Sequence, residues 1–267
     1  MVGAVALLTA ASACRREEPA PAPVIHETLL ARSTVPDPGA QQCAQCHADI
    51  VAEWASSQHA HANRLVSDAL DRTAFDPPTS LAHGSFVTTM ARTRDGQFTF
   101  SVAFSNQPPD TYHAEAVIGI TPLRQYLVTF PGGRLQTVDV SYDPRSNDWF
   151  NAFGVDNRQP HEWGFWKNRS MTWNVQCAFC HMTGFEKNYD IPTDSYNSTW
   201  QAMGISCAQC HTPKAQVSGF SVQVPGKTNE CPMVEPFHPD TRHPTPDTVV
   251  MDNCASCHAR REELFGT

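Results

Sequence analysis

The sequence predicts an α+β fold with little regular secondary structure, made of short helices, loops and a small inserted antiparallel sheet. The 267 residues include 21 prolines, which favour irregular stretches between short elements. Residues 85–142 alternate apolar and polar side chains around an Asp95-Gly96 turn and a Pro-Gly-Gly turn at 131–133, as antiparallel hairpins do. Residues 48–70 are rich in alanine and contain few helix breakers, which predicts a helix.

The composition is that of a globular chain with room for one large domain or two small ones. Hydrophobic residues make up 40% of it, and the mean hydropathy is -0.38. The formal net charge of -8 argues against nucleic acid or an anionic membrane surface as a partner.

The first residues have the pattern of an export signal. The apolar run Val2–Ala11 is too short to span a membrane, and Ala-Ser-Ala-Cys at 11–14 resembles the cleavage site of bacterial lipoproteins. We therefore expect a signal peptide at 1–14, a lipid anchor on Cys14 and a Pro-rich tether at 15–40. This predicts a periplasmic or outer-membrane-associated lipoprotein, with an ordinary cleaved signal as the alternative.

Residues 41–267 would then form the main domain, with the β insertion at about 85–142. Eight of the ten cysteines in the sequence fall into four CxxCH motifs within it. The cysteine pairs are Cys43 and Cys46, Cys177 and Cys180, Cys207 and Cys210, and Cys254 and Cys257, followed by His47, His181, His211 and His258. The chain ends soon after the fourth motif, which suggests a fragment boundary.

Each CxxCH motif combines covalent attachment of haem with an iron ligand. The two thiols add to the haem vinyl groups as thioethers, and the adjacent histidine is the proximal axial ligand. The sequence therefore predicts four covalently bound haem c groups, surrounded by the short helices and loops. Structural zinc and disulfides are the alternatives, but zinc does not require histidine after every CxxC pair, and exported proteins rarely keep cysteines reduced. Cys231 is left over, as an incidental thiol or a partner of an unlipidated Cys14.

Several stretches resemble bacterial multihaem cytochromes c, some of which are fused to tetratricopeptide repeats. They are CAQCHADIVAEWASSQHAHA, GITPLRQYLVTFPGGRLQ, WNVQCAFCHMTGFEKNYD and NCASCHARREEL, and the likeness extends over residues 42–264. That group is distantly similar to hydroxylamine-oxidising and nitrite-reducing multihaem enzymes. The resemblance implies haem-based redox chemistry.

Distal iron ligands are expected among the eight histidines outside the motifs. The resemblance implies His59, the histidine of its SxHA pattern, then His83 before the first strand and His161 ahead of the second motif. If residues 47–59 form one helix, His47 and His59 lie about 18 Å apart, so His59 would serve a neighbouring haem. His61 competes with His59 through its helical face, which it shares with Trp54.

His243 and His238 compete for the last position because both precede the fourth motif closely. We favour His243. Trp54 and Trp173 are expected to pack against haem rather than to relay electrons.

Electron transfer is the function that we expect, with other cytochromes or a membrane quinol oxidase or reductase module as redox partners. The motifs and the histidines outside them favour an electron carrier in which every iron has two axial protein ligands. The alternative is a redox enzyme in which one five-coordinate haem acts on a small nitrogen or sulfur compound.

Overall fold

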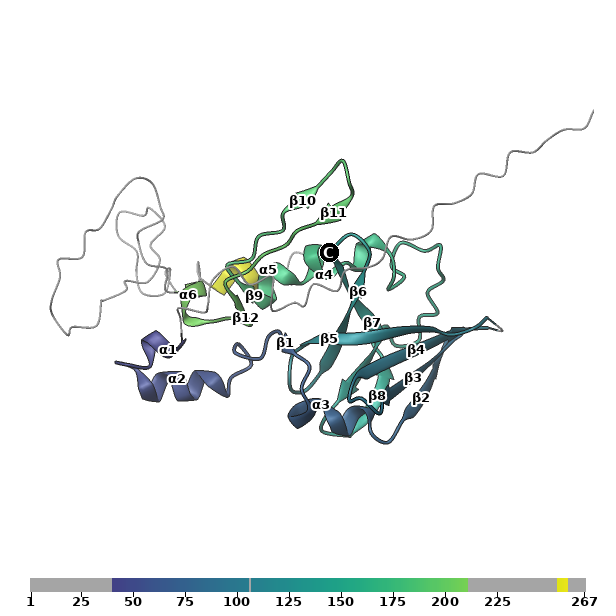
Figure 1. Cartoon of the computed structure of the whole chain (residues 1–267), viewed down its shortest axis with the longest axis horizontal. Coiled ribbons are helices and arrows are strands. Elements are labelled where there is room, and N and C mark those ends of the chain that lie inside the picture. Colours follow the sequence, from purple (N-terminus) through teal and green to yellow (C-terminus); the bar gives the residue numbers. More distant parts are fainter. Residues whose placement is uncertain (1–39, 106, 211–253, 259–267) are drawn as a thin grey trace, which may run out of the picture.

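A curled antiparallel sheet dominates the computed structural model, which describes residues 40–105, 107–210 and 254–258 (Figure 1). Seven strands follow one another in the order β2-β3-β4-β5-β6-β7-β8, and β1 pairs with β5. Their bounds are β1 Arg64–Leu65, β2 Thr79–His83, β3 Phe86–Arg92, β4 Phe98–Phe104, β5 Asp110–Ile118, β6 Arg124–Phe130, β7 Arg134–Asp143 and β8 Asp148–Asn151. The edge strands β2 and β8 approach each other, so the sheet nearly closes.

The predicted α+β class with a small inserted sheet is wrong, because the described part of the chain is mostly β. The two predicted hairpins are confirmed: β3 pairs with β4 across the Asp95-Gly96 turn, and β6 pairs with β7 across residues 131–133. The sheet also contains strands that lie before and after the predicted insertion, so it extends from Thr79 to Asn151. Burial on both faces conceals much of the alternation in β7, where eight successive residues are buried.

The helices are few and short. They are α1 Ala40–Cys43, α2 Ala48–Ala55, α3 Asp68–Phe75, the 3-10 turn η2 Arg169–Met171, α4 Trp173–Gln176, α5 Ala178–His181, α6 Cys207–Cys210 and a helical turn at 254–258. Two small ribbons complete the fold, β9 Met182–Thr183 with β12 Ala202–Met203, and β10 Tyr189–Asp190 with β11 Ser195–Tyr196. Among the described residues, every helix falls short of the length and apolar character needed to cross a membrane.

The helix predicted over 48–70 ends at Ala55. Ser56 follows as its C-terminal cap, and the Ser56 hydroxyl donates a hydrogen bond to the Glu53 carbonyl at 2.9 Å. Serine side chains compete in this way for helical backbone groups, which favours a helix end. The predictions for the signal segment, the tether, Cys14, Cys231, His211, His238 and His243 lie outside the described residues.

An aromatic core fills the concave side of the sheet. Phe75 of α3 lies at its centre, with its ring 5.0 Å from those of Phe98 and Tyr126 and 5.3 Å from those of Phe100 and Trp149. Phe75, Phe100 and Tyr126 are fully buried. Burial of rings at these separations stabilises the interior of the sheet.

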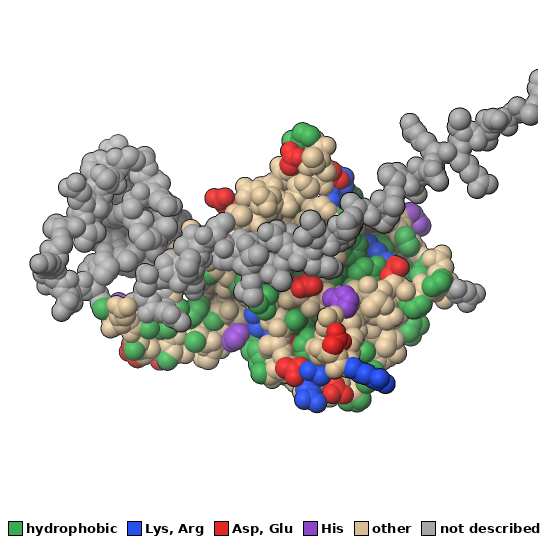
Figure 2. Space-filling view, viewed as in Figure 1, with side chains coloured by type: hydrophobic (Ala, Val, Ile, Leu, Met, Phe, Trp, Pro, Cys, Tyr) green, Lys and Arg blue, Asp and Glu red, His purple; other side chains and the backbone are tan. Residues whose placement is uncertain are grey.

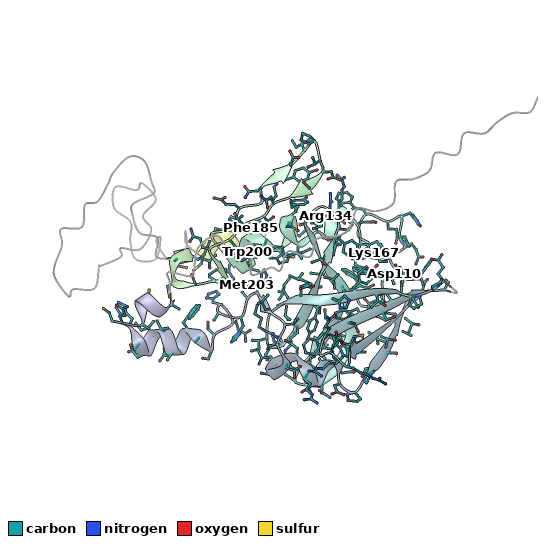
Figure 3. The ribbon with its side chains drawn as sticks, in the orientation of Figure 1. Asp110, Arg134, Lys167, Phe185, Trp200 and Met203 are labelled. Carbon is teal, nitrogen blue, oxygen red and sulfur yellow. The ribbon has the colours of Figure 1, made fainter. Side chains whose placement is uncertain are left out.

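A second apolar cluster joins the outer face of the sheet to the segments that carry cysteines. Tyr126 and Val128 face the aromatic core, so Leu127 between them faces the other way, as side chains alternate along a strand. Leu127, Leu135 and Ala116 pack there with Trp173, Ala178, Met182 and Trp200. Phe185 and Met203 border this outer cluster, close to Trp200 in Figure 3. The sheet is therefore the platform against which α4 and α5 rest.

A buried ionic network attaches α3 to the sheet. Asp71 is fully buried and accepts two hydrogen bonds from the Arg64 guanidinium, at 2.7 and 2.8 Å. The Tyr126 hydroxyl donates to the same carboxylate at 3.0 Å, and Arg124 lies 3.7 Å away. Two arginines share one acidic partner here, so the charge balance of the site depends on Asp71.

Asp71→Ala should lower the free energy of unfolding by about 3–5 kcal/mol, because it leaves the buried Arg64 and Arg124 charges without a counterion. Asp68→Ala is the matched control on the same helix. Its carboxylate pairs with Arg92 at 2.8 Å on the surface, where Figure 2 shows acidic and basic side chains mixed over α3. That loss should be about 1 kcal/mol or less. Urea unfolding followed by circular dichroism measures both, and equal losses would contradict the network's role.

Candidate haem-binding centre

Parts of all four CxxCH motifs lie on one side of the sheet, around α1, α2, α5, α6 and the turn at 254–258 (Figure 1). Motifs three and four are close to each other: burial raises the pKa of the Cys210 thiol, and the nearby Cys254 and Cys257 thiols raise it further. His59, which follows motif one, lies beside His258 of motif four. Motifs far apart in the sequence thus form one centre.

Most cysteines of this centre lie outside disulfide bonds. Cys43, Cys177, Cys180, Cys207, Cys210, Cys254 and Cys257 are not disulfide-bonded, whereas Cys46 is. Burial, with a smaller effect of the Cys180 thiol, raises the pKa of Cys177 to about 11. The Cys177 thiol is therefore protonated at neutral pH. Thioether formation at Cys46 would require that its disulfide first be reduced.

The His181 ring is held in one tautomer. Its Nδ1 lies 2.8 Å from the Ala62 carbonyl, and because a carbonyl can only accept, Nδ1 carries the proton. In a neutral ring Nε2 then has the lone pair that binds a metal. A second hydrogen bond of this kind typically orients metal-binding histidines. This is the tautomer that the predicted role of His181 as a proximal ligand requires.

The His59 and His258 rings lie at the separation of two axial ligands on one iron. An imidazole nitrogen binds a transition metal at about 2.0 Å and lies about 1.2 Å from its ring centre, so two axial rings have centres about 6.4 Å apart. The observed distance between the His59 and His258 ring centres is 6.2 Å, with an angle of 63° between the planes. Both side chains are exposed, so packing in the protein core does not account for the approach.

Motifs two and three are joined by hydrogen bonds at or next to their CxxCH residues. The Thr183 hydroxyl donates to the Gly204 carbonyl at 2.8 Å and accepts from the Ser206 N–H at 2.8 Å. The Gly184 N–H donates to Oε1 of Gln209, inside motif three, at 3.1 Å. These bonds, with the pairing of β9 and β12, fix the second attachment segment against the third.

His83 lies in β2 within the sheet, away from the motifs. It is buried, its Nε2 is 2.8 Å from the Thr88 hydroxyl, and its Nδ1 is 3.6 Å from Asp139. Burial lowers the pKa of His83 and raises that of Asp139 to about 7. Both ring nitrogens thus face protein groups, so this arrangement gives no support to the prediction that His83 is a distal ligand.

The other predicted histidines and tryptophans differ in burial and in hydrogen bonding. His161 is exposed on the loop before η2. His61 follows the end of α2, so the helical face it was expected to share with Trp54 does not exist. Trp173 is buried in the outer cluster, and its Nε1 donates to Oδ1 of Asn63 at 3.1 Å. Trp54 donates from Nε1 to the Ile205 carbonyl at 2.8 Å, a partner that the sequence does not reveal.

The backbone groups that hydrogen-bond to side chains of the centre could not be predicted from the sequence. The Ala62 carbonyl, the Ile205 peptide groups and Gly204 carry no motif, because any residue type supplies a carbonyl or an N–H. Of these, only Gly204 is marked by its residue type, since its φ of +74° lies where glycine is favoured.

The donors present fit haem better than a protein-only metal site. Within the described ranges, no three His, Cys, Asp or Glu side chains come together to hold a metal ion. A haem iron takes four ligands from its porphyrin, so the chain needs to provide only axial ligands. The His59–His258 pair and the fixed His181 tautomer meet that requirement.

Comparison with known families supports, at a coarse level, a multihaem c-type cytochrome. The family model that matches is described as cytochrome c554 and c-prime, and it covers residues 42–76 and 156–212. The two segments contain motifs one to three, and strands β2 to β8 lie between them. Comparison with curated proteins and with solved structures gives no match.

His83→Ala should leave the haem spectrum unchanged and lower the free energy of unfolding by about 1–3 kcal/mol, because Thr88 and Asp139 lose a buried partner. Absorption spectra of the oxidised and reduced holoprotein, with urea unfolding, measure the two effects. A new high-spin haem in this variant would show instead that His83 binds iron.

Proposed function

We propose that this chain is a tetrahaem electron carrier in which His258 and His59 are the proximal and distal ligands of the haem attached at Cys254 and Cys257. The observation that carries the proposal is the 6.2 Å separation of the two ring centres. The four CxxCH motifs support the number of haems, and motif four lies outside the segments that match the family.

Haem c, when bound, supplies an iron that alternates between the ferric and ferrous states. The chain's own residues do the rest. The cysteine pairs fix each group covalently, and His181 presents Nε2 while Ala62 holds the proton on Nδ1. His59 and His258 would hold the iron of the haem attached at motif four, and together they would leave no open position there for a substrate.

Closed coordination favours a carrier over an enzyme. An enzyme acting on a small nitrogen or sulfur compound needs an iron with an open position and nearby acid–base groups. In the proposed pair, His59, which follows motif one, is instead the second iron ligand of the haem attached at motif four. Such cross-ligation ties the haems into one cluster, as electron hopping between them requires.

The signal-like segment at 1–14 supports a proposal for the location of the protein. We propose a periplasmic or outer-membrane-associated lipoprotein anchored through Cys14. Its partners would be other cytochromes or a membrane quinol oxidase or reductase module. The net charge of -8 supports protein partners over nucleic acid.

Mass spectrometry of protein made with the cytochrome c maturation machinery should find four haems per chain. The wild-type holoprotein should be low-spin when oxidised, because every iron has two protein ligands. When reduced it should bind carbon monoxide only slowly, at the rate at which an axial histidine dissociates. Rapid stoichiometric carbon monoxide binding at one haem would favour the enzyme. Fewer than four haems would refute the tetrahaem state.

His59→Ala should produce one high-spin haem that binds carbon monoxide and has a raised reduction potential, since loss of an imidazole donor disfavours the ferric state. His61→Ala, two residues away, is the matched control and should change nothing. Carbon monoxide titration with optical redox titration measures both variants.

The pairing with motif four has its own test. In a Cys254→Ala, Cys257→Ala background, which lacks the fourth haem, His59→Ala should open no further site. A new carbon monoxide site in that background would assign His59 to a different haem and contradict the pairing, while leaving the carrier proposal in place.

A further inference from the structure

Ile205 holds the segment after motif one through both of its backbone groups. Its N–H donates to the His59 carbonyl at 2.8 Å, and its carbonyl accepts from Nε1 of Trp54 at 2.8 Å. Ile205 itself is buried and stands two residues before Cys207. The two bonds therefore fasten both ends of residues 54–59 to the entrance of motif three.

The His59 side chain depends on this backbone attachment. The ring is exposed, so core packing does not hold it, and α2 has already ended at Ala55. The turn that carries it is closed by short-range bonds, from the Ala60 N–H to the Ser57 hydroxyl and from the Ala62 N–H to the His59 carbonyl. These bonds shape the turn, and Ile205 fixes where the turn lies.

Gly204 permits the close approach. A Cβ atom at this position would lie 2.4 Å from the Ala60 carbonyl oxygen and 3.0 Å from that of His59, closer than real Cβ contacts. Its φ of +74° is strained for any other residue type. On its other side, the Gly204 carbonyl accepts from the Thr183 hydroxyl, so residues 204–205 are anchored to the segment after motif two.

We propose that residues 204–205, the docking strap, together with the Trp54 indole are a positioning device for the His59 ligand. They set the distance between His59 and His258, and so the fraction of molecules in which the fourth iron has both axial ligands. The proposal rests on the proposed His59–His258 pair. Because the strap leads directly into Cys207, it makes ligation of the fourth haem depend on the placement of the third.

Trp54→Phe tests the device, since it removes the indole N–H and keeps an aromatic ring. The loss of one hydrogen bond, about 1 kcal/mol, should raise the fraction of molecules without the His59 ligand about 5-fold. The reduced holoprotein should then bind carbon monoxide about 5-fold faster than the wild type, because carbon monoxide enters only when His59 leaves.

Trp149→Phe is the matched control, because its Nε1 also donates to a main-chain carbonyl, that of Ala74, at 2.8 Å, but inside the sheet core. It should lower stability to a similar extent without changing carbon monoxide binding. Equal rates for Trp54→Phe and the wild type, with His59→Ala opening one haem, would overturn the positioning role and leave the axial pair intact. If His59→Ala opens no haem, both proposals fail.

Gly204→Ala tests the strap from the other side and should raise carbon monoxide binding more than Trp54→Phe does. Gly96→Ala is its control, since Gly96 has a φ of +89° in a hairpin turn and its Cβ would meet only the end of the Arg92 side chain, at 3.1 Å. Equal behaviour of the two glycine variants would contradict the strap. If Gly204→Ala does not fold, the Trp54→Phe comparison decides.

Discussion

The docking of residues 54–65 onto three other segments is the constraint on which the centre depends. The Ala62 carbonyl accepts from His181 of motif two, and the His59 carbonyl accepts from Ile205 ahead of motif three. Arg64 and Leu65 pair with β5 as strand β1, which ties the same stretch to the sheet. With its ends and middle fixed, the stretch has little freedom in where it presents His59. Motif four then approaches that histidine with His258.

The sheet contributes to the haem centre as a support. Its aromatic core packs ring against ring on the concave side, and on the outer face Leu127 and Leu135 contact Trp173 and Met182. This outer face gives short segments such as α4 and α5 an apolar surface to pack against. The sheet strands β2 to β8 occupy the stretch between the two segments that match the family, so this support stands apart from the motifs themselves.

The features that depend on short-range chemistry could be predicted from the sequence. The cysteine motifs and the turn at Asp95-Gly96 are local patterns, and each defines its own geometry within a few residues. The extent of the sheet could not be predicted, because β7 is buried on both faces and lacks a clear alternation. The helix beyond Ala55 was predicted from composition, yet serine capping and long-range bonds to Ile205 ended it.

The iron-ligand assignments also divide into those that local sequence indicates and those that depend on tertiary contacts. His59 was selected from its motif, but its partner, 199 positions further along the sequence, emerges only from the folded chain. His83, which was also expected from the resemblance, lies instead in a buried contact with Thr88 and Asp139. A histidine's identity says that it can bind iron, and the tertiary contacts decide whether it faces one.

Anomalous X-ray diffraction from crystals of the holoprotein, at the iron absorption edge, would show whether His59 and His258 share one iron. We predict four iron peaks per chain, one of them between the His59 and His258 rings at about 2.0 Å from a nitrogen of each. An iron at motif four with a group other than His59 opposite His258, or with an open position there, would contradict this pairing.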